Sequence, residues 1–275
     1  MDKVWKEENL ARAIAVVVRN QGGAGVDGIS TEQLKERHEQ IRSKLHHHLK
    51  DRSYEPRPVK WVWIPKLGTK ELRPLGIPAV EDRAAQTALR NVLEPIFERD
   101  FAPHSYGFRP RRGSQGALRE VASLLEQGHH WVVDADIKGY FDNIPQEKLL
   151  TAVAVKVADG AVLDLIERFL KQGVMESGQG RKPTEQGAPQ GAVIGPLLAN
   201  IYLDPLDRLM VRQGWKMARY ADDFIILCAS REQAEAALET VRQWMGPAGL
   251  TLHPPQNAHC RCQSERRFRF PRVSL

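Results

Sequence analysis

The sequence has little cysteine and no long hydrophobic run. Its three cysteines are Cys228, Cys260 and Cys262, and a single Cys-x-Cys pair lacks the second half of a zinc site. Neither a disulfide framework nor a structural metal is therefore indicated. The apolar runs at 13–18 and 224–228 are far shorter than the roughly 20 residues that a membrane-spanning helix needs. No secretory signal opens the chain, so we expect a cytoplasmic protein without membrane contact.

The composition is that of a globular protein, and its charge is weak evidence for function. Hydrophobic residues make up 42% of the 275 residues and charged residues 27%, which favours one large or two small folded domains. The net charge is +6, but residues 256–275 hold five arginines against one glutamate and carry +4 of it. The rest of the chain is almost neutral, so a basic surface for nucleic acid does not follow from net charge alone.

The hydrophobic pattern predicts an α+β fold. Alternating residues at 60–64 and 72–77, around a turn at 68–69, predict a basic hairpin. Further along, strands are predicted at 131–137, 217–220, 224–228 and 250–252, and helices at 81–99, 146–157, 162–172, 196–209 and 231–245. This order matches a split βαββαβ sheet with helices on one face. In that topology the first strand lies beside the hairpin formed by the second and third.

This topology brings three aspartates together. Asp136 ends the first strand, and Asp222 and Asp223 occupy the hairpin tip. Two like charges about 4 Å apart repel by about 4 kcal/mol at an effective dielectric constant near 20, unless a cation lies between them. Oxygen ligands without histidine or thiolate favour Mg²⁺ over zinc, so the cluster predicts phosphoryl transfer by two Mg²⁺ ions. Taken singly, each aspartate is more often an ordinary turn or strand-end residue.

Six blocks along the chain resemble those of group II intron-encoded reverse transcriptases, and they occur in that family's order. They read Arg73-Pro74-Leu75-Gly76-Ile77-Pro78, Leu93-Glu94-Pro95-Ile96-Phe97-Glu98, Ser105-Tyr106-Gly107-Phe108-Arg109-Pro110, Asp136-Ile137-Lys138-Gly139-Tyr140-Phe141-Asp142-Asn143-Ile144, Pro189-Gln190-Gly191 with Pro196-Leu197-Leu198-Ala199-Asn200-Ile201-Tyr202-Leu203, and Tyr220-Ala221-Asp222-Asp223. The resemblance runs from about residue 25 to 255. Retron and CRISPR-associated reverse transcriptases share the Asp-Asp box but fit the flanking blocks less well.

The resemblance implies a fold of reverse-transcriptase fingers and palm without a thumb. Residues 1–130 would form the fingers, with N-terminal helices and the basic hairpin. Residues 131–255 would form the palm, with a fingers-like helical insertion at about 146–190. Asp136, Asp222 and Asp223 correspond to the catalytic, metal-binding aspartates, and the Ile137 carbonyl to an additional ligand. Because successive strand residues point to opposite faces, we expect Asp222 to be the stronger ligand of the adjacent pair.

The same resemblance implies four nucleotide-binding residues. Phe141 matches the aromatic residue that lies under the incoming sugar and excludes a 2′-hydroxyl group, although core packing is the alternative for any phenylalanine. Gln190 matches a glutamine that contacts the nucleotide. Arg73 and Lys66 match finger residues that bind the triphosphate, a role that suits the forked donors of arginine.

The resemblance stops after Pro255, and the remaining tail predicts a change of reading frame. Permitted codons for residues 256–261 and 266–274, read one base later, give the Lys-Thr-Arg-Ile and Phe-x-Phe-Leu-Gly-Tyr blocks that the family places there. We therefore expect residues 256–275 to be an out-of-frame, disordered tail in a chain truncated after the palm blocks. Sequencing the encoding locus checks this, because an intact frame through the tail contradicts it.

The sequence thus predicts an RNA-directed DNA polymerase of a mobile group II intron, impaired by truncation. Its partners would be an intron RNA template, a DNA primer and deoxyribonucleoside triphosphates, with no obligate protein partner. The alternatives are an RNA-binding splicing cofactor (a maturase), against which the intact carboxylates count, and another bacterial reverse transcriptase such as a retron type.

Overall fold

The computed structural model describes residues 1–65, 72–176, 180–188, 191–253 and 258–261. These residues form two compact units. The first unit comprises Met1–Phe97 and Gln146–Leu198, and the second comprises Glu98–Pro145 and Ala199–Leu275. Among the helices of the described ranges, none is long and apolar enough to cross a membrane.

The first unit combines helices with a small sheet. Its helices are α1 (Asp2–Trp5), α2 (Glu7–Asn20), α3 (Thr31–Glu36), α4 (His38–Lys50), α5 (Val80–Glu98, whose last residue falls in the second unit), α8 (Gln146–Ala154) and α9 (Gly160–Lys171). The strands β1 (Val59–Pro65), β2 (Leu72–Ile77), β4 (Val174–Glu176) and β5 (Arg181–Lys182) lie in the order β2-β1-β4-β5. The antiparallel pairing of β1 with β2 confirms the predicted hairpin, while its turn lies outside the described residues.

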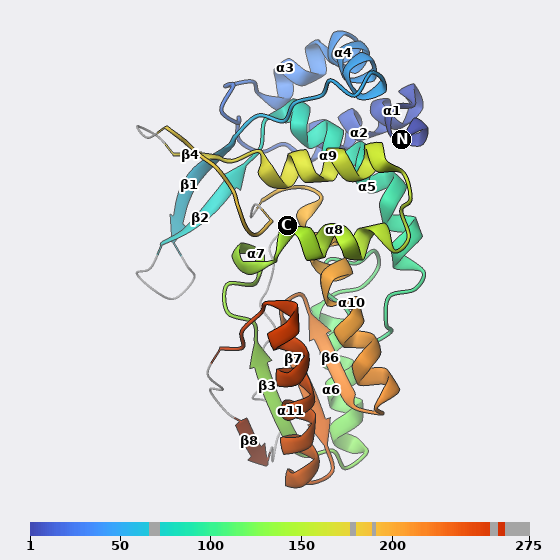
Figure 1. Ribbon diagram of the computed structural model, residues 1–275, viewed down its shortest axis with the longest axis vertical. Coiled ribbons are helices and arrows are strands. Elements are labelled where there is room, and N and C mark those ends of the chain that lie inside the picture. The colour runs from blue at the N-terminus through green and yellow to red at the C-terminus, as the bar shows by residue number, and fades with distance from the viewer. Residues whose placement is uncertain (66–71, 177–179, 189–190, 254–257, 262–275) are drawn as a thin grey trace. The chain divides into compact units, whose positions relative to one another are not determined.

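The second unit is built on a four-stranded antiparallel sheet (Figure 1). Its strands are β3 (Trp131–Asp136), β6 (Lys216–Tyr220), β7 (Asp223–Cys228) and β8 (Ala258–Arg261), in the order β6-β7-β3-β8. Its helices are α6 (Ser114–Glu126), α7 (Tyr140–Asn143), α11 (Arg231–Ala248) and the part of α10 (Gly195–Arg212) that begins at Ala199. The first strand lies beside the β6–β7 hairpin, as the split βαββαβ prediction requires.

The prediction that helices cover one face of this sheet was wrong. In β7, Ile225 and Leu227 belong to a buried apolar cluster with α6, and the residues between them, such as Ile226, are buried as well. Helix α11 packs along β7 and β3 and contributes nothing to that cluster; it crosses in front of the sheet in Figure 1. A continuous apolar run, rather than an alternating one, is typical of a strand that is buried on both faces.

The fourth strand also differs from the prediction. Leu252, expected within a strand at 250–252, makes only an isolated bridge with Ile137. The strand that completes the sheet is β8, which pairs with β3 inside the tail that was expected to be disordered. An open sheet edge offers a row of backbone N–H and C=O groups to any extended segment, whatever its side chains. Residues 262–275 lie outside the described part of the chain.

The boundary between the two units differs from the predicted limit of the fingers at residue 130. Residues 98–130 join the second unit, because α6 packs on β6 and β7 of the sheet. The segment 146–198, which spans the expected helical insertion at 146–190, joins the first unit. The functional names of fingers and palm stay predictions for these units.

Candidate active site

A two-residue hairpin turn carries one of the predicted aspartates. Tyr220 pairs with Asp223 across the β6–β7 ladder, so Ala221 and Asp222 form the turn between them. Ala221 has a φ of +60°, in the left-handed region that disfavours a residue with a side chain by about 1–2 kcal/mol. Turns with a positive φ at the first central position normally place glycine there. The surrounding structure must therefore hold this turn in place.

Two of the predicted aspartates lie directly opposite each other on neighbouring strands. Asp136 is the register partner of Asp223 at the end of the β3–β7 ladder. Directly opposed residues of an antiparallel pair project to the same face with Cβ atoms about 5 Å apart. Asp222 lies in the adjoining turn, directly before Asp223. The three aspartates are therefore neighbours in the fold. The prediction that β3 and the hairpin tip bring these residues together is confirmed for the backbone.

Burial raises the pKa of all three carboxyl groups, and repulsion between them adds to the effect at Asp222 and Asp223. Burial, with a contribution from Asp136, raises the pKa of Asp222 to about 6. Burial, followed by the charges of Asp222 and Asp136, raises the pKa of Asp223 to about 7. Burial also raises the pKa of Asp136, although His253 counteracts the effect; the His253 Nε2 atom lies 3.8 Å from Asp136 Oδ2. Without a cation, the ionised cluster is thus unfavourable at neutral pH.

Replacing Asp223 by asparagine is therefore expected to stabilise the cation-free protein. A folded-state pKa raised from 3.8 to about 7 means that the folded state binds more protons than the unfolded state between these values, so stability falls as pH rises from about 4 to 7. Discounted for partial exposure, the gain at pH 8 should be about 1–3 kcal/mol. Urea unfolding from pH 4 to 8 in EDTA measures it. Equal stability of the two proteins at pH 8 would contradict the repulsion.

The donor set fits a hard divalent cation, although it does not enclose one. In the described ranges, no group of three or more His, Cys, Asp and Glu side chains is placed to hold a metal ion. Carboxylate oxygens are the ligands that Mg²⁺ prefers, and Mg²⁺ in proteins commonly uses one or two carboxylates, with water and substrate phosphates completing its shell. An opposed carboxylate pair with a third carboxylate beside it satisfies that requirement.

Ile137 can offer only its backbone carbonyl to a metal ion, because its side chain is apolar and buried. Its bridge to Leu252 is made by hydrogen bonds on either side of it. The His253 N–H donates to the Asp136 carbonyl (2.8 Å), and the Lys138 N–H donates to the Thr251 carbonyl (2.8 Å). In this pattern the carbonyl of the central residue points away from the partner segment. The proposed ligand role of the Ile137 carbonyl is compatible with this orientation.

Phe141 lies on α7, five residues after Asp136, and is only partly buried. The core residue of this short helix is its neighbour Tyr140, which is 2% exposed and donates from its hydroxyl to the Ala199 carbonyl (2.6 Å). The Phe141 ring packs edge-on against Phe108, with ring centroids 6.2 Å apart. Tyr140 is thus the core residue of α7, and the sugar contact of Phe141 stays a prediction beside the packing alternative.

The other predicted nucleotide-binding residues belong to the first unit. Arg73 lies on β2 opposite Ile64, whereas Lys66 and Gln190 lie outside the described residues. Gly191, which follows Gln190, has a φ of +94°, and a Cβ atom there would lie 2.0 Å from the Gly76 carbonyl oxygen. The glycine thus lets the backbone at position 191 approach the strand that carries Arg73.

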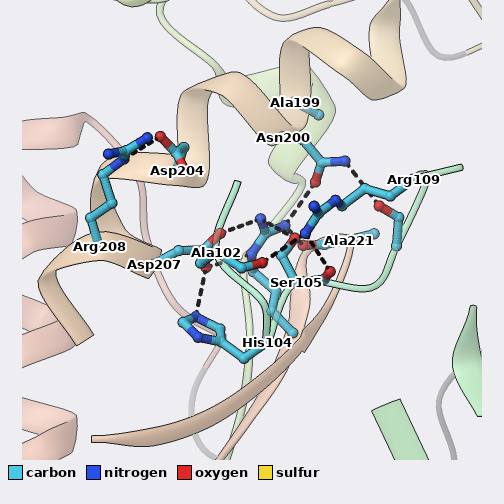
Figure 2. A network of polar contacts seen from close by, with 12 residues as sticks. Ala102, His104, Ser105, Arg109, Ala199, Asn200, Asp204, Asp207, Arg208 and Ala221 are labelled. Carbon is cyan, nitrogen blue, oxygen red and sulfur yellow. Dashed lines mark hydrogen bonds and ion pairs between the residues drawn. The ribbon is translucent and has the colours of Figure 1, made fainter. Parts of the chain in front are cut away.

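Sequence reasoning missed a buried arginine, Arg219, next to the Ala221-Asp222 turn; Figure 2 labels its partners Ser105, Asn200, Asp207 and Ala221. Arg219 is fully buried in β6, and its guanidinium group pairs with the Asp207 carboxylate of α10 at 2.8 and 2.5 Å. Burial alone would raise the pKa of Asp207, but the Arg219 charge and hydrogen bonds hold it below its usual value. A charged residue two positions after Met217, in the interior of a predicted strand, was the available signal, because a buried charge has to be paired.

The loop before α6 was also missed as part of this site. The Ser105-Tyr106-Gly107 segment runs beside β6, where the Tyr106 N–H donates to the Arg219 carbonyl (2.8 Å). A Cβ atom on Gly107 would lie 2.2 Å from the Ala221 nitrogen. Only glycine allows this loop to lie directly against the turn.

The protein can now be compared with known families. The sequence model described as "Reverse transcriptase (RNA-dependent DNA polymerase)" matches residues 64–268, which is more than half of the chain. The chain belongs to the reverse transcriptase family. Members of this family use divalent metal ions and act on a nucleic acid template and primer. The match reaches residue 268, so the prediction that resemblance ends after Pro255 was wrong, whereas nothing tests the predicted change of frame.

Two relatives identify the type of this reverse transcriptase. "Group II intron-encoded protein LtrA" from Lactococcus lactis subsp. cremoris is 40% identical over 199 residues, covering 72% of this chain and 32% of that protein. "Protein YkfC" from Escherichia coli is 34% identical over 279 residues, covering 87% of this chain and 73% of that protein. The reverse transcriptase is thus of the group II intron-encoded type, as its sequence blocks predicted. It spans about a third of the length of LtrA.

Solved structures support the same fold for this reverse transcriptase. The "Partial Cas6-RT-Cas1--Cas2 complex" matches with a TM-score of 0.52 and 26% identity, covering 90% of this chain and 41% of that chain. A telomerase from Candida tropicalis matches with a TM-score of 0.51 and 13% identity, covering 71% of this chain and 48% of that chain. At 13% identity, the telomerase match supports similarity of the fold alone.

Proposed function

We propose that this chain carries the RNA-directed DNA polymerase centre of a group II intron. The observation that supports it is the arrangement of Asp136, Asp222 and Asp223 at the end of the β3–β7 ladder, where burial raises the pKa of all three and repulsion adds to it at Asp222 and Asp223. Such a cluster gains stability from a divalent cation. The chemistry is phosphoryl transfer, in which a primer hydroxyl attacks the innermost phosphate of a deoxyribonucleoside triphosphate, a phosphodiester bond forms, and the bond to the second phosphate breaks to release pyrophosphate.

In this proposal the carboxylates hold two Mg²⁺ ions. Asp136 and Asp223 would share one position as opposed ligands, and Asp222 would be the strongest ligand of the turn, with the Ile137 carbonyl assisting. Bound there, Mg²⁺ lowers the pKa of the primer hydroxyl and neutralises charge on the phosphates. The protein's own part is to fix the carboxylates before the substrates arrive, which removes reorganisation from the reaction step.

The substrates follow from the family and from the remaining predicted residues. Arg73 and Lys66 would bind the triphosphate, Gln190 the nucleotide, and Phe141 the sugar. The template would be intron RNA and the primer DNA, since the most informative relative is named as a group II intron-encoded protein. The sequence alternative, a splicing cofactor without polymerase chemistry, is also consistent with the intron-encoded relatives, but no observation favours it over the polymerase.

Primer extension tests the proposal. The purified chain is incubated with an RNA template, an annealed DNA primer and the four deoxyribonucleoside triphosphates, with Mg²⁺ or with EDTA. We expect extension that requires both the RNA template and Mg²⁺. Extension on the template that persists in excess EDTA would contradict a metal-dependent centre. Binding of template without extension at any Mg²⁺ concentration would favour the splicing cofactor.

Replacing Phe141 by alanine is expected to relax sugar discrimination. If the ring excludes a 2′-hydroxyl group, its removal should raise the relative incorporation of ribonucleotides by about tenfold or more, since selectivity is a difference of affinities. Single-nucleotide insertion measures kcat/KM for a ribonucleotide and for its deoxy counterpart. Phe108→Ala serves as the control, because it removes the neighbouring ring and leaves Phe141 in place. An unchanged ratio in Phe141→Ala would assign the ring to packing.

A further inference from the structure

The buried arginine next to the catalytic turn uses its whole guanidinium group. Besides its bonds to Asp207, Arg219 Nη1 donates to the Ala221 carbonyl (2.8 Å) and to Asn200 Oδ1 (3.0 Å), and Nη2 donates to Ser105 Oγ (2.8 Å). All of these residues belong to the second unit, and Figure 2 labels the four partners Ser105, Asn200, Asp207 and Ala221, which lie close together. Three separate segments, α10, the chain at Ser105 and the turn, thus meet at one side chain.

Asn200 extends this set of contacts to the loop behind the turn. It accepts from Arg219 through Oδ1 and donates through Nδ2 to the Gly107 carbonyl (2.9 Å). Gly107 in turn lies directly against Ala221. Asn200 and Asp207 are seven residues apart on α10 and therefore lie on the same face of that helix. The turn is held through the Ala221 carbonyl on one side and through the Gly107 backbone on the other.

We propose that Arg219, Asp207 and Asn200 form a positioning network that imposes the left-handed conformation of Ala221 and thereby aims the carboxylate of Asp222. None of the three is a catalytic residue, since each acts through the backbone of the turn. The inference rests on the proposed polymerase centre. Residues that orient metal ligands typically change metal affinity or activity by 10- to 100-fold when they are substituted.

The geometry of the guanidinium group makes the network specific for arginine. The planar fork supplies several donors in fixed directions, whereas a lysine ammonium is a single point charge on a flexible chain. A lysine at position 219 can keep the ion pair with Asp207, but it cannot at the same time reach the Ala221 carbonyl and Asn200. Arg219→Lys therefore separates charge pairing from positioning of the turn.

The test compares Arg219→Lys with Arg109→Lys. Arg109 is also buried in the second unit and bonded to a carboxylate, that of Glu98 (2.8 Å), but its other bonds go to the Ala102 and Ser105 carbonyls rather than to the turn. For each protein we measure thermal unfolding, Mn²⁺ affinity without nucleic acid, and kcat and KM for primer extension. The Mn²⁺ measurement needs no polymerase activity.

Arg219→Lys is expected to weaken Mn²⁺ binding and to lower kcat by about tenfold or more, with KM for the nucleotide changed less. Arg109→Lys should lower the unfolding temperature to a similar degree while keeping Mn²⁺ affinity within about threefold. If Arg219→Lys does not fold, Asn200→Ala, which preserves the ion pair, should show the same loss of Mn²⁺ affinity. Mn²⁺ affinity and kcat that fall equally in the two lysine variants would overturn the proposal.

The failure of this inference can be told apart from a failure of the proposed function. If the unsubstituted protein binds Mn²⁺ but extends no primer, the polymerase proposal fails, and the Mn²⁺ affinities of the variants still decide the positioning role. If the unsubstituted protein binds no Mn²⁺, the Asp222 carboxylate that the network aims is not a metal ligand, and both proposals are overturned.

Discussion

Replacing Asp222 by asparagine is expected to lower the rate of primer extension by at least about a thousandfold. Metal-ion catalysis supplies several kcal/mol of transition-state stabilisation, and each 1.4 kcal/mol corresponds to a factor of ten in rate. RNA affinity should stay within about twofold, because it arises mainly from phosphate contacts with basic residues. Asp136→Asn should behave in the same way. Single-turnover extension and filter binding at one fixed salt concentration measure the two quantities.

Asp134→Asn provides the matched control for these substitutions. Asp134 lies on β3 two residues before Asp136, projects to the same face, and pairs with Ile225 rather than with an aspartate. We expect its rate within about threefold of the unsubstituted protein. More than about a tenth of the normal rate in Asp222→Asn or Asp136→Asn would remove these residues from the proposed metal centre. A loss in Asp134→Asn equal to theirs would point to a general effect of charge on this face.

Replacing Gly107 by alanine is expected to have the second largest effect, about a hundredfold loss of extension rate. The added Cβ atom would lie 2.2 Å from the Ala221 nitrogen and 3.0 Å from the Ala221 Cα atom, so the turn or the loop has to move. A shift of about 1 Å in a reacting group can lower the rate by about a hundredfold. Overpacking should also destabilise the fold by about 1–3 kcal/mol. Single-turnover extension and urea unfolding measure both effects.

Gly113→Ala is the control for that substitution. Gly113 precedes α6 in the same unit, has an extended φ of −170°, and has open space where a Cβ atom would be added. Its extension rate should be unchanged and its stability close to that of the unsubstituted protein. A Gly107→Ala variant with normal rate and stability would show that the loop is not held against the turn.

Much of the second unit could be predicted from local sequence. The apolar runs at 131–133 and 224–228 mark two neighbouring strands, and the two residues between β6 and β7 mark their hairpin. These signals depend on residues close together in the chain, where periodicity and turn geometry are informative. The opposition of Asp136 and Asp223 followed from the order of the strands.

The missed features depend on contacts between distant segments. The partner of Arg219 lies twelve residues away on another element, and Ser105 lies more than a hundred residues away. The helix α6 contains Gly116, which lowers helix propensity, and its place on the sheet follows from Val121 and Leu124 packing on β7. The strand β8 forms by backbone pairing with β3, which would otherwise be an edge strand. Such pairing does not depend on the side chains of β8, so its sequence carried no strand signal.

The Arg219–Asp207 pair also limits how this sequence can change over time. Both side chains are fully buried, so replacing one of them by an uncharged residue leaves the charge of the other without its main partner, which typically destabilises a protein by about 3–5 kcal/mol. Only a simultaneous change at both positions avoids that intermediate. The two codons are therefore expected to vary as one unit, and lineages that drift elsewhere in the chain should keep or lose the pair together.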